Sequence, residues 1–211
     1  RTARAIGGAI MPWSASKPLL LASKSQARQT LLRSCGIAFE TCGVEFDERG
    51  FEKTHPTLKP DGLAGALALA KAEAARITYP DRMILAADQI LLFEDHVLHQ
   101  CPTRAEARAQ LQKLSGKSHH LISAAVILDE DNNRNTWQET ATLHMRPLSV
   151  DEIDAYLDRE GPAVLNSVGC YFYESHGALL FERVTGSLPA IMGLPLDGIK
   201  QFLIEQGYLK P

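Results

Sequence analysis

In "LLASKSQARQTLL", Leu20 to Leu32, a strand pattern changes to a helix pattern within a few residues. The apolar run "PLLLAS" is typical of a buried strand, and Ser25 is a good N-cap for a helix that ends at Gly36. Lys24 and Arg28 then stand at the helix N-terminus, where the helix dipole disfavours cations. Either both side chains are exposed, at a cost of a few tenths of a kcal/mol, or a polyanion binds at this helix end.

Short apolar runs and amphipathic helix patterns alternate along the rest of the chain, which indicates an α/β fold. The capping boxes Thr103–Glu106 and Ser149–Glu152 predict helices through Leu114 and Leu157. The other predicted helices are "DGLAGALALAKAEAARI" and one from Pro195 to near Gly207. The predicted strands are "IAFETCGV", "RMILAAD", "HHLISAAVIL", "TWQETATLHM" and "GALLFERV", and "FDERGFEKTHPTLKP" is predicted to be a loop.

The chain of 211 residues, 45% of them hydrophobic, can bury a sizeable core. No linker separates independent domains, so we predict a single domain over residues 18–211. Residues 1–17 are predicted to be an N-terminal extension. The part before Met11 is a candidate cloning remnant or alternative-start extension, because the sequence does not begin with methionine.

Composition excludes several classes of protein. The net charge of −3 and pI near 6.2 argue against a protein that binds duplex nucleic acid. No apolar run approaches the length of a membrane-spanning helix, so no membrane association is expected. The cysteines are too dispersed for a CxxC motif, which favours reduced thiols and a cytoplasmic location. They are Cys35, Cys42, Cys101 and Cys170.

Lys71 and Asp88 are the first candidates for chemistry. Lys71 shares a helix face with Leu63 and Leu67, so it either has a partner there or snorkels at the edge of the apolar stripe. Asp88 follows the apolar residues 83–87, at the predicted end of a buried strand. A carboxylate in that place commonly holds a metal or a catalytic water, or else caps the next turn.

Asp47 and Glu48 form an adjacent acidic pair after a predicted strand. On strand geometry their side chains point opposite ways, so we expect at most one to face a given site, and a solvated loop edge is the alternative. The pair His119–His120 has no second ligand cluster, which favours an edge-strand or surface role over zinc. "LSGKS" lacks the first glycine of a Walker motif and follows a helix, so Gly116 is predicted to end that helix.

Taken together, the candidates are two cations, Arg28 and Lys71, and up to three carboxylates at strand and helix ends. This is the combination that binds a metal-bound phosphate ester.

The chain resembles the Maf family, whose members are nucleoside triphosphate pyrophosphatases. The resemblance runs in order from Leu19 to about Gly207. It is carried by "LLLASKSQARQTLLRSCGIAFE" for the family's S-x-S-x-x-R motif, "FDER", "LALAKAEAA" and "ILAADQ". Further matches are "ARAQLQKLSGKSHHLISAAVIL", "SVGCYFYESHGALLFERVTG" and "MGLPLDGIKQFL".

This resemblance implies a mixed central sheet flanked by helices, with two lobes around a cleft, as in inosine-triphosphatase-like proteins, and often a homodimer. It implies hydrolysis of a nucleoside triphosphate to the monophosphate and pyrophosphate, with Mg²⁺ or Mn²⁺ as cofactor. The family is thought to clear unwanted nucleotides and is linked to arrest of cell division.

The resemblance also implies roles for individual residues. Ser23 and Ser25 would lie against the phosphates with Arg28, and Lys71 would be a second phosphate cation. Asp88 would hold the metal or orient the attacking water, helped by Asp47 or Glu48.

The chain departs from the family pattern at four positions. Gln29 replaces a second arginine, Ala87 replaces a glycine, Ser187 replaces an aspartate, and Cys101 replaces a lysine before Pro102. Lys24 is a candidate to compensate for the lost lysine. The alternatives to a pyrophosphatase are a catalytically impaired nucleotide-binding regulator of cell division and a phosphomonoesterase.

Overall fold

The computed structural model describes residues 13–210. The candidate start Met11 therefore lies outside the described residues. The end of the predicted extension, residues 13–17, lies against the C-terminal segment. Trp13 pairs with Leu209 in an isolated antiparallel bridge and stacks on Tyr208, with ring centroids 6.0 Å apart.

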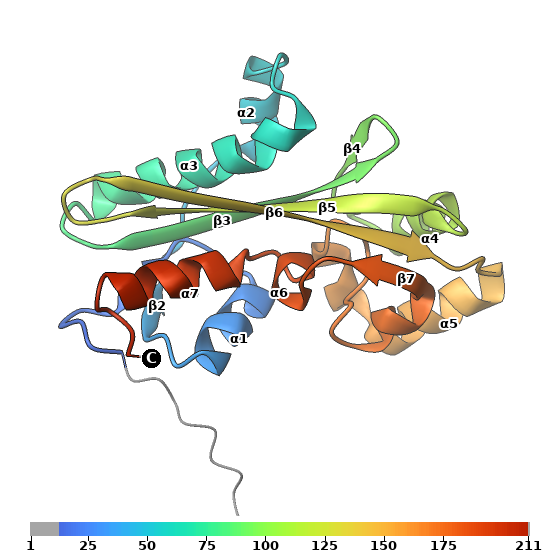
Figure 1. Ribbon diagram of the computed structural model, residues 1–211. Coiled ribbons are helices and arrows are strands. Elements are labelled where there is room, and N and C mark those ends of the chain that lie inside the picture. Colours follow the sequence, from blue (N-terminus) through green and yellow to red (C-terminus); the bar gives the residue numbers. More distant parts are fainter. Residues whose placement is uncertain (1–12, 211) are drawn as a thin grey trace, which may run out of the picture.

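A mixed seven-stranded sheet lies at the centre of the molecule (Figure 1), in the order β2-β1-β3-β5-β6-β7, with β4 paired to β3. This confirms the predicted mixed sheet. β1 (Leu19–Leu21) is parallel to β2 (Phe39–Thr41) and to β3 (Ile84–Phe93). The other neighbours are antiparallel: β4 (His96–Leu98), β5 (Ser118–Leu128), β6 (Arg134–Met145) and β7 (Phe181–Thr185).

Helices cover both faces of the sheet (Figure 1). On one face lie α3 (Pro60–Thr78) and α2 (Glu48–Thr54). On the opposite face lie α1 (Gln26–Ser34), α6 (Leu188–Ile191) and α7 (Leu196–Glu205), with α4 (Arg104–Leu114) and α5 (Val150–Glu160) at the β7 end. Two short 3₁₀ helices, η1 (Pro162–Asn166) and η2 (His176–Leu180), precede β7.

Because successive side chains of a strand point to opposite faces of the sheet, the apolar core has one part on each face. On the α3 face, Ala86 and Ile90 of β3 are buried toward the helix. On the opposite face the apolar side chains form two clusters, one under α1 and α7 that includes Leu85, and one against α4 and α5 that includes Leu91 and Phe93. The two predicted lobes stay a prediction.

Strand β3 has an interrupted edge. One edge pairs with β5 over nearly its whole length. Along the other edge β1 pairs with residues 84–85 and β4 with residues 91–93. Among the described residues no strand pairs with this edge over residues 86–90. Asp88 lies in the middle of this gap.

The structure corrects four expectations. The predicted strand "GALLFERV" begins only at Phe181, because the residues before it form η2. The predicted loop "FDERGFEKTHPTLKP" contains α2, which Asp47 caps by accepting a hydrogen bond from Gly50 N at 2.9 Å. Asp88 is not at a strand end, because the apolar residues after it continue β3 to Phe93. His119 is not at the surface: it lies on β5 and is fully buried.

Two glycines at the same position of their helices give a matched test of packing. A Cβ on Gly198 in α7 would lie 2.4 Å from Trp137 Cδ1, whereas a Cβ on Gly62 in α3 would meet no atom within 4 Å. We expect Gly198→Ala to lower the free energy of unfolding by about 1–3 kcal/mol through overpacking. Gly62→Ala should raise it by about 0.5–1 kcal/mol, because alanine favours the helix. Urea denaturation of both variants measures the difference, and equal effects would contradict the packing at Trp137.

Candidate functional site

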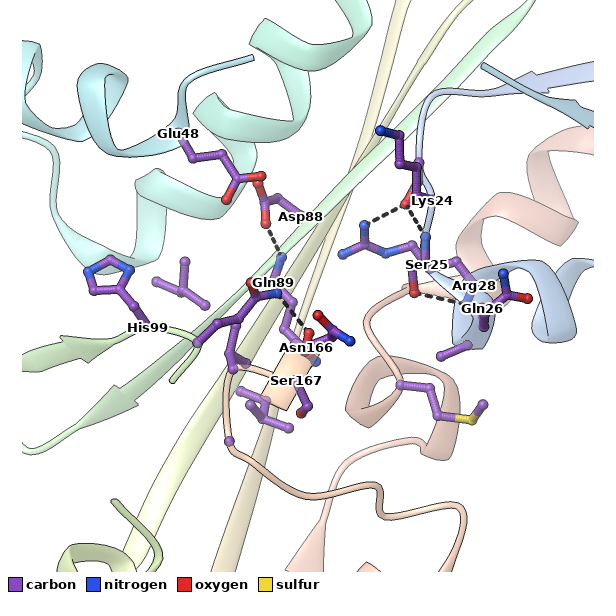
Figure 2. A pocket seen from close by; sticks show the side chains of 18 of the residues that line it. Lys24, Ser25, Gln26, Arg28, Glu48, Asp88, Gln89, His99, Asn166 and Ser167 are labelled. Atoms are coloured by element: carbon purple, nitrogen blue, oxygen red, sulfur yellow. Dashed lines mark hydrogen bonds between the residues drawn. The ribbon is translucent and has the colours of Figure 1, made fainter. Parts of the chain in front are cut away.

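A cavity of about 910 Å³ opens at the gap in the edge of β3. Its walls come from the N-terminus of α1, from α2, α3 and β3, from the loop after β4, and from residues 163–175. Figure 2 shows Asp88 and Gln89 of β3 in its middle. The cavity therefore brings together segments from the whole length of the chain.

Lys71 joins two carboxylates at the cavity. Its Nζ lies 2.7 Å from Asp88 Oδ2 and 2.6 Å from Glu48 Oε1. The side chains of Lys71 and Asp88 are 14% and 10% exposed, whereas that of Glu48 is 51% exposed. Asp88 Oδ1 also accepts a hydrogen bond from Gln89 N at 2.7 Å. Lys71 therefore has carboxylate partners, which is one of the two alternatives that its place on the apolar stripe left open.

Arg28 is buried, which rules out the exposed arginine that the sequence left open. Its Nε donates to Gly193 O at 2.9 Å, and its Nη1 donates to Ala87 O at 2.8 Å and to Ser23 Oγ at 3.1 Å. Among the described residues no hydrogen bond involves Nη2. Burial lowers the pKa of Arg28, while the charges of Asp88 and Glu48 oppose this shift. The guanidinium stays cationic at neutral pH and has donors left for a ligand.

The two serines have hydroxyl hydrogens free to donate. Ser23 Oγ accepts hydrogen bonds from Ser25 N at 3.2 Å and from Arg28 Nη1. Ser25 Oγ caps α1 by accepting from Arg28 N at 3.4 Å. Because each oxygen acts as an acceptor in these contacts, its own hydrogen remains available, and both residues line the cavity.

The structure brings most of the sequence-predicted residues together, but not all. Ser23, Lys24 and Ser25 line the cavity with Arg28, Glu48, Lys71 and Asp88. Asp47 does not line it, because its carboxylate caps α2. Cys101 is buried in the cluster against α4 and α5 and does not line the cavity either.

Sequence reasoning missed three groups. Gln89 Nε2 donates to Ser123 Oγ, Ala190 O and Ile191 O at 2.9–3.0 Å, which fixes α6 against the sheet. Glu52 and His99 face each other on the cavity wall. The spacing of Glu48 and Glu52 would have indicated that they share a face if α2 had been predicted as a helix.

His119 and Tyr171 form a buried pair, of which Tyr171 lines the cavity. His119 Nε2 and Tyr171 Oη are 2.7 Å apart, and His119 Nδ1 is buried without a partner among the described residues. Burial raises the pKa of Tyr171, which keeps the phenol neutral, and lowers that of His119 to about 4.

Fold and cavity define an α/β protein with a charged cavity at an open strand edge. The chain belongs to the Maf family: the model of the Maf-like proteins matches residues 18–206. A nucleoside triphosphate pyrophosphatase of Rhodopseudomonas palustris (strain BisB18) is 40% identical over 199 residues, which cover 93% of this chain and 98% of the relative. A 7-methyl-GTP pyrophosphatase of Bartonella henselae is 41% identical over 183 residues, covering 86% and 91%.

Among solved structures, the Ham1 protein of Staphylococcus aureus is similar with a TM-score of 0.45 and 14% identity. The likeness covers 90% of this chain and 100% of that one.

His119 should make stability depend on pH. Its folded pKa of about 4 is below the ordinary 6.5, so folding favours the neutral imidazole. This contribution is complete above about pH 6.5 and is lost as pH falls toward 4. The loss is about 3 kcal/mol. Urea denaturation across this range measures how the free energy of unfolding changes with pH, and the slope should be shallower in His119→Gln, which removes the titrating ring, than in the wild type. An unchanged slope in His119→Gln would contradict the prediction.

Proposed function

We propose that this chain is a nucleoside triphosphate pyrophosphatase, which releases a nucleoside monophosphate and pyrophosphate. The observation that carries the proposal is the convergence of Arg28, Lys71 and Asp88 on one cavity from α1, α3 and β3. Cations that neutralise a polyphosphate and a carboxylate that orients water are the groups this hydrolysis needs. The names of the relatives given above support the same activity.

The phosphates bind at the N-terminus of α1. Backbone N–H groups and the helix dipole favour an anion there, and the first turn holds no acidic residue. Arg28 Nη2 and the hydroxyl hydrogens of Ser23 and Ser25 supply donors around the same point. The lysine beside them, Lys24, adds a cation at the cavity wall. A bound polyphosphate then explains why Lys24 and Arg28 stand at this helix N-terminus.

Two carboxylates, Asp88 and Glu48, are the candidate ligands of a divalent cation. One oxygen of each lies within 2.7 Å of Lys71 Nζ, so they converge on a point that the ammonium group holds. The described residues contain no group of three or more His, Cys, Asp or Glu that could hold a metal by itself. Mg²⁺ and Mn²⁺ prefer such oxygen ligands, and Mg²⁺ is commonly held by one or two carboxylates together with phosphates and water. When bound, the cation neutralises phosphate charge. Asp47 is a poorer candidate because its carboxylate is engaged at the helix cap.

Asp88 orients the attacking water and accepts its proton, while Lys71 neutralises charge on the transferred phosphoryl group. Lys71 also holds the Asp88 carboxylate in place. Asp88→Asn should therefore lower pyrophosphate release about 10²- to 10⁴-fold. The assay is release of pyrophosphate from a panel of ordinary and modified nucleoside triphosphates, with Mg²⁺, with Mn²⁺ and with chelator.

The same assay separates the alternatives. Orthophosphate in place of pyrophosphate would indicate a phosphomonoesterase. No release from the wild type, with recovery in Cys101→Lys, would indicate a nucleotide-binding regulator that has lost its activity.

The adjacent acids give a matched pair of variants. Glu48→Gln removes a carboxylate from the cavity and should raise the Mg²⁺ concentration needed for half-maximal activity about 10- to 100-fold. Asp47→Asn keeps a side chain that caps helices well, so its activity should stay near that of the wild type. The measurement is a Mg²⁺ titration of both variants, and a larger effect at Asp47 would reverse the assignment.

The cellular setting is part of the proposal. We place the protein in the cytoplasm, which its four free cysteines support. No helix among the described residues is long and apolar enough to cross a membrane. A homodimer and a role in cell-division arrest stay predictions. Comparing cell length on overproduction of the wild type and Asp88→Asn would test the latter.

A further inference from the structure

His99 and Glu52 form a second charged pair on the cavity wall. His99 Nε2 lies 3.5 Å from Glu52 Oε2, and the two side chains are 43% and 23% exposed. Both residues line the cavity that holds Lys71 and Asp88. The imidazole is therefore accessible to a ligand and has a carboxylate beside it.

The backbone positions His99 from two sides. On one side, β4 pairs with β3 in the register Leu91↔Leu98, so the chain after Leu98 runs back toward Asp88. On the other side, Gln100 Nε2 donates to Asn166 O at 2.7 Å and ties the loop to η1. His99 is thus fixed next to the uncovered stretch of β3.

Glu52 is also held in place. Glu48 and Glu52 are one turn apart on α2, and both reach basic groups at the cavity. Phe51 packs into the apolar cluster under α3, with its ring centroid 5.6 Å from that of Phe46. The packing of Phe51 therefore holds α2 in place, and Glu48 and Glu52 line the cavity.

Figure 2 shows His99 on the side of the cavity opposite Lys24, Ser25 and Arg28, with Asp88 between them. If the terminal phosphates bind at α1 and the scissile bond lies at Asp88, the α-phosphate faces His99. We propose that His99 is a substrate-binding residue whose imidazolium contacts the α-phosphate, and that Glu52 is its positioning residue. This inference rests on the proposed function.

The expected signature is a pH-dependent affinity. A protonated imidazole attracts phosphate, so binding should weaken as pH rises and the ring loses its charge. The other charged groups around the cavity also bear on this dependence, so only the difference between wild type and a His99 variant is diagnostic. These groups are Lys24, Arg28, Glu48, Arg49, Glu52, Lys71, Asp88, Glu160 and Glu174.

The experiment measures binding of α,β-methylene UTP and α,β-methylene GTP by calorimetry from roughly pH 5.5 to pH 8.5, where histidines titrate. At the acid end His99→Asn should bind about tenfold more weakly than the wild type, as expected for loss of one charged hydrogen bond. At the alkaline end the two should converge. His99→Lys should keep the tight binding at every pH. Glu52→Gln should weaken binding less than His99→Asn does.

The control is His96→Asn, an exposed histidine of β4 that does not line the cavity. It should bind like the wild type at every pH. Equal pH dependence in the wild type and His99→Asn, or binding by His99→Lys as weak as that of His99→Asn, would overturn the inference. If the wild type binds the analogues but releases no pyrophosphate from any triphosphate, the proposed function fails and the His99 contact is judged on its pH dependence alone. Failure to bind either analogue overturns the inference, while the proposed function is judged on pyrophosphate release from the panel.

Discussion

The structure depends on the uncovered edge of β3. Two different strands share this edge, and residues 86–90 between them have no strand partner there among the described residues. Buried backbone carbonyls need hydrogen-bond donors, and a gap in a sheet leaves them without one. Arg28 donates to Ala87 O and so fills this need with a cation. The same contact that completes the backbone hydrogen bonds therefore places a cation at the cavity wall.

The ion pair between Lys71 and Asp88 supports a functional interpretation of the cavity. Removing charges from water costs free energy, and apolar residues of similar size are often as stabilising as a buried ion pair. The pair is largely buried on the α3 face of the sheet, where Ala86 and Ile90 show that apolar side chains fit. Chemistry in the cavity accounts for the pair better than stability of the fold does.

The two clusters on the opposite face of the sheet explain how the cavity stays open. One packs β1 and β3 against α1 and α7, and the other packs β5 and β6 against α4 and α5. Gln89 joins them by holding the backbone of α6 with its amide, and Ser123 accepts from the same amide. The cavity therefore has walls from elements of both clusters, and the hydrogen bonds of Gln89 lie between them.

Local sequence signals determined much of the architecture. The capping residues Ser25, Thr103 and Ser149 begin helices because their side chains accept backbone N–H groups, and this requires no tertiary contact. Short apolar runs identified the long strands β3 and β5, since both faces of these strands are buried. Arg28, Lys71 and Asp88 were identified as candidates from their positions on these elements.

Tertiary structure decided what local signals could not. α2 is a short helix whose stability comes from packing of Phe51, so its sequence resembles that of a loop. Because α2 was not predicted, the sequence could not show which of Asp47 and Glu48 faces the cavity. Glu52 was not identified as a candidate for the same reason. Whether Asp88 ended its strand depended on pairing with β5, a segment distant in sequence. The sequence by itself determined which charged residues are candidates for a binding or catalytic site. Their convergence on one cavity was decided by strand pairing and helix packing, because contacts between distant segments leave no local pattern.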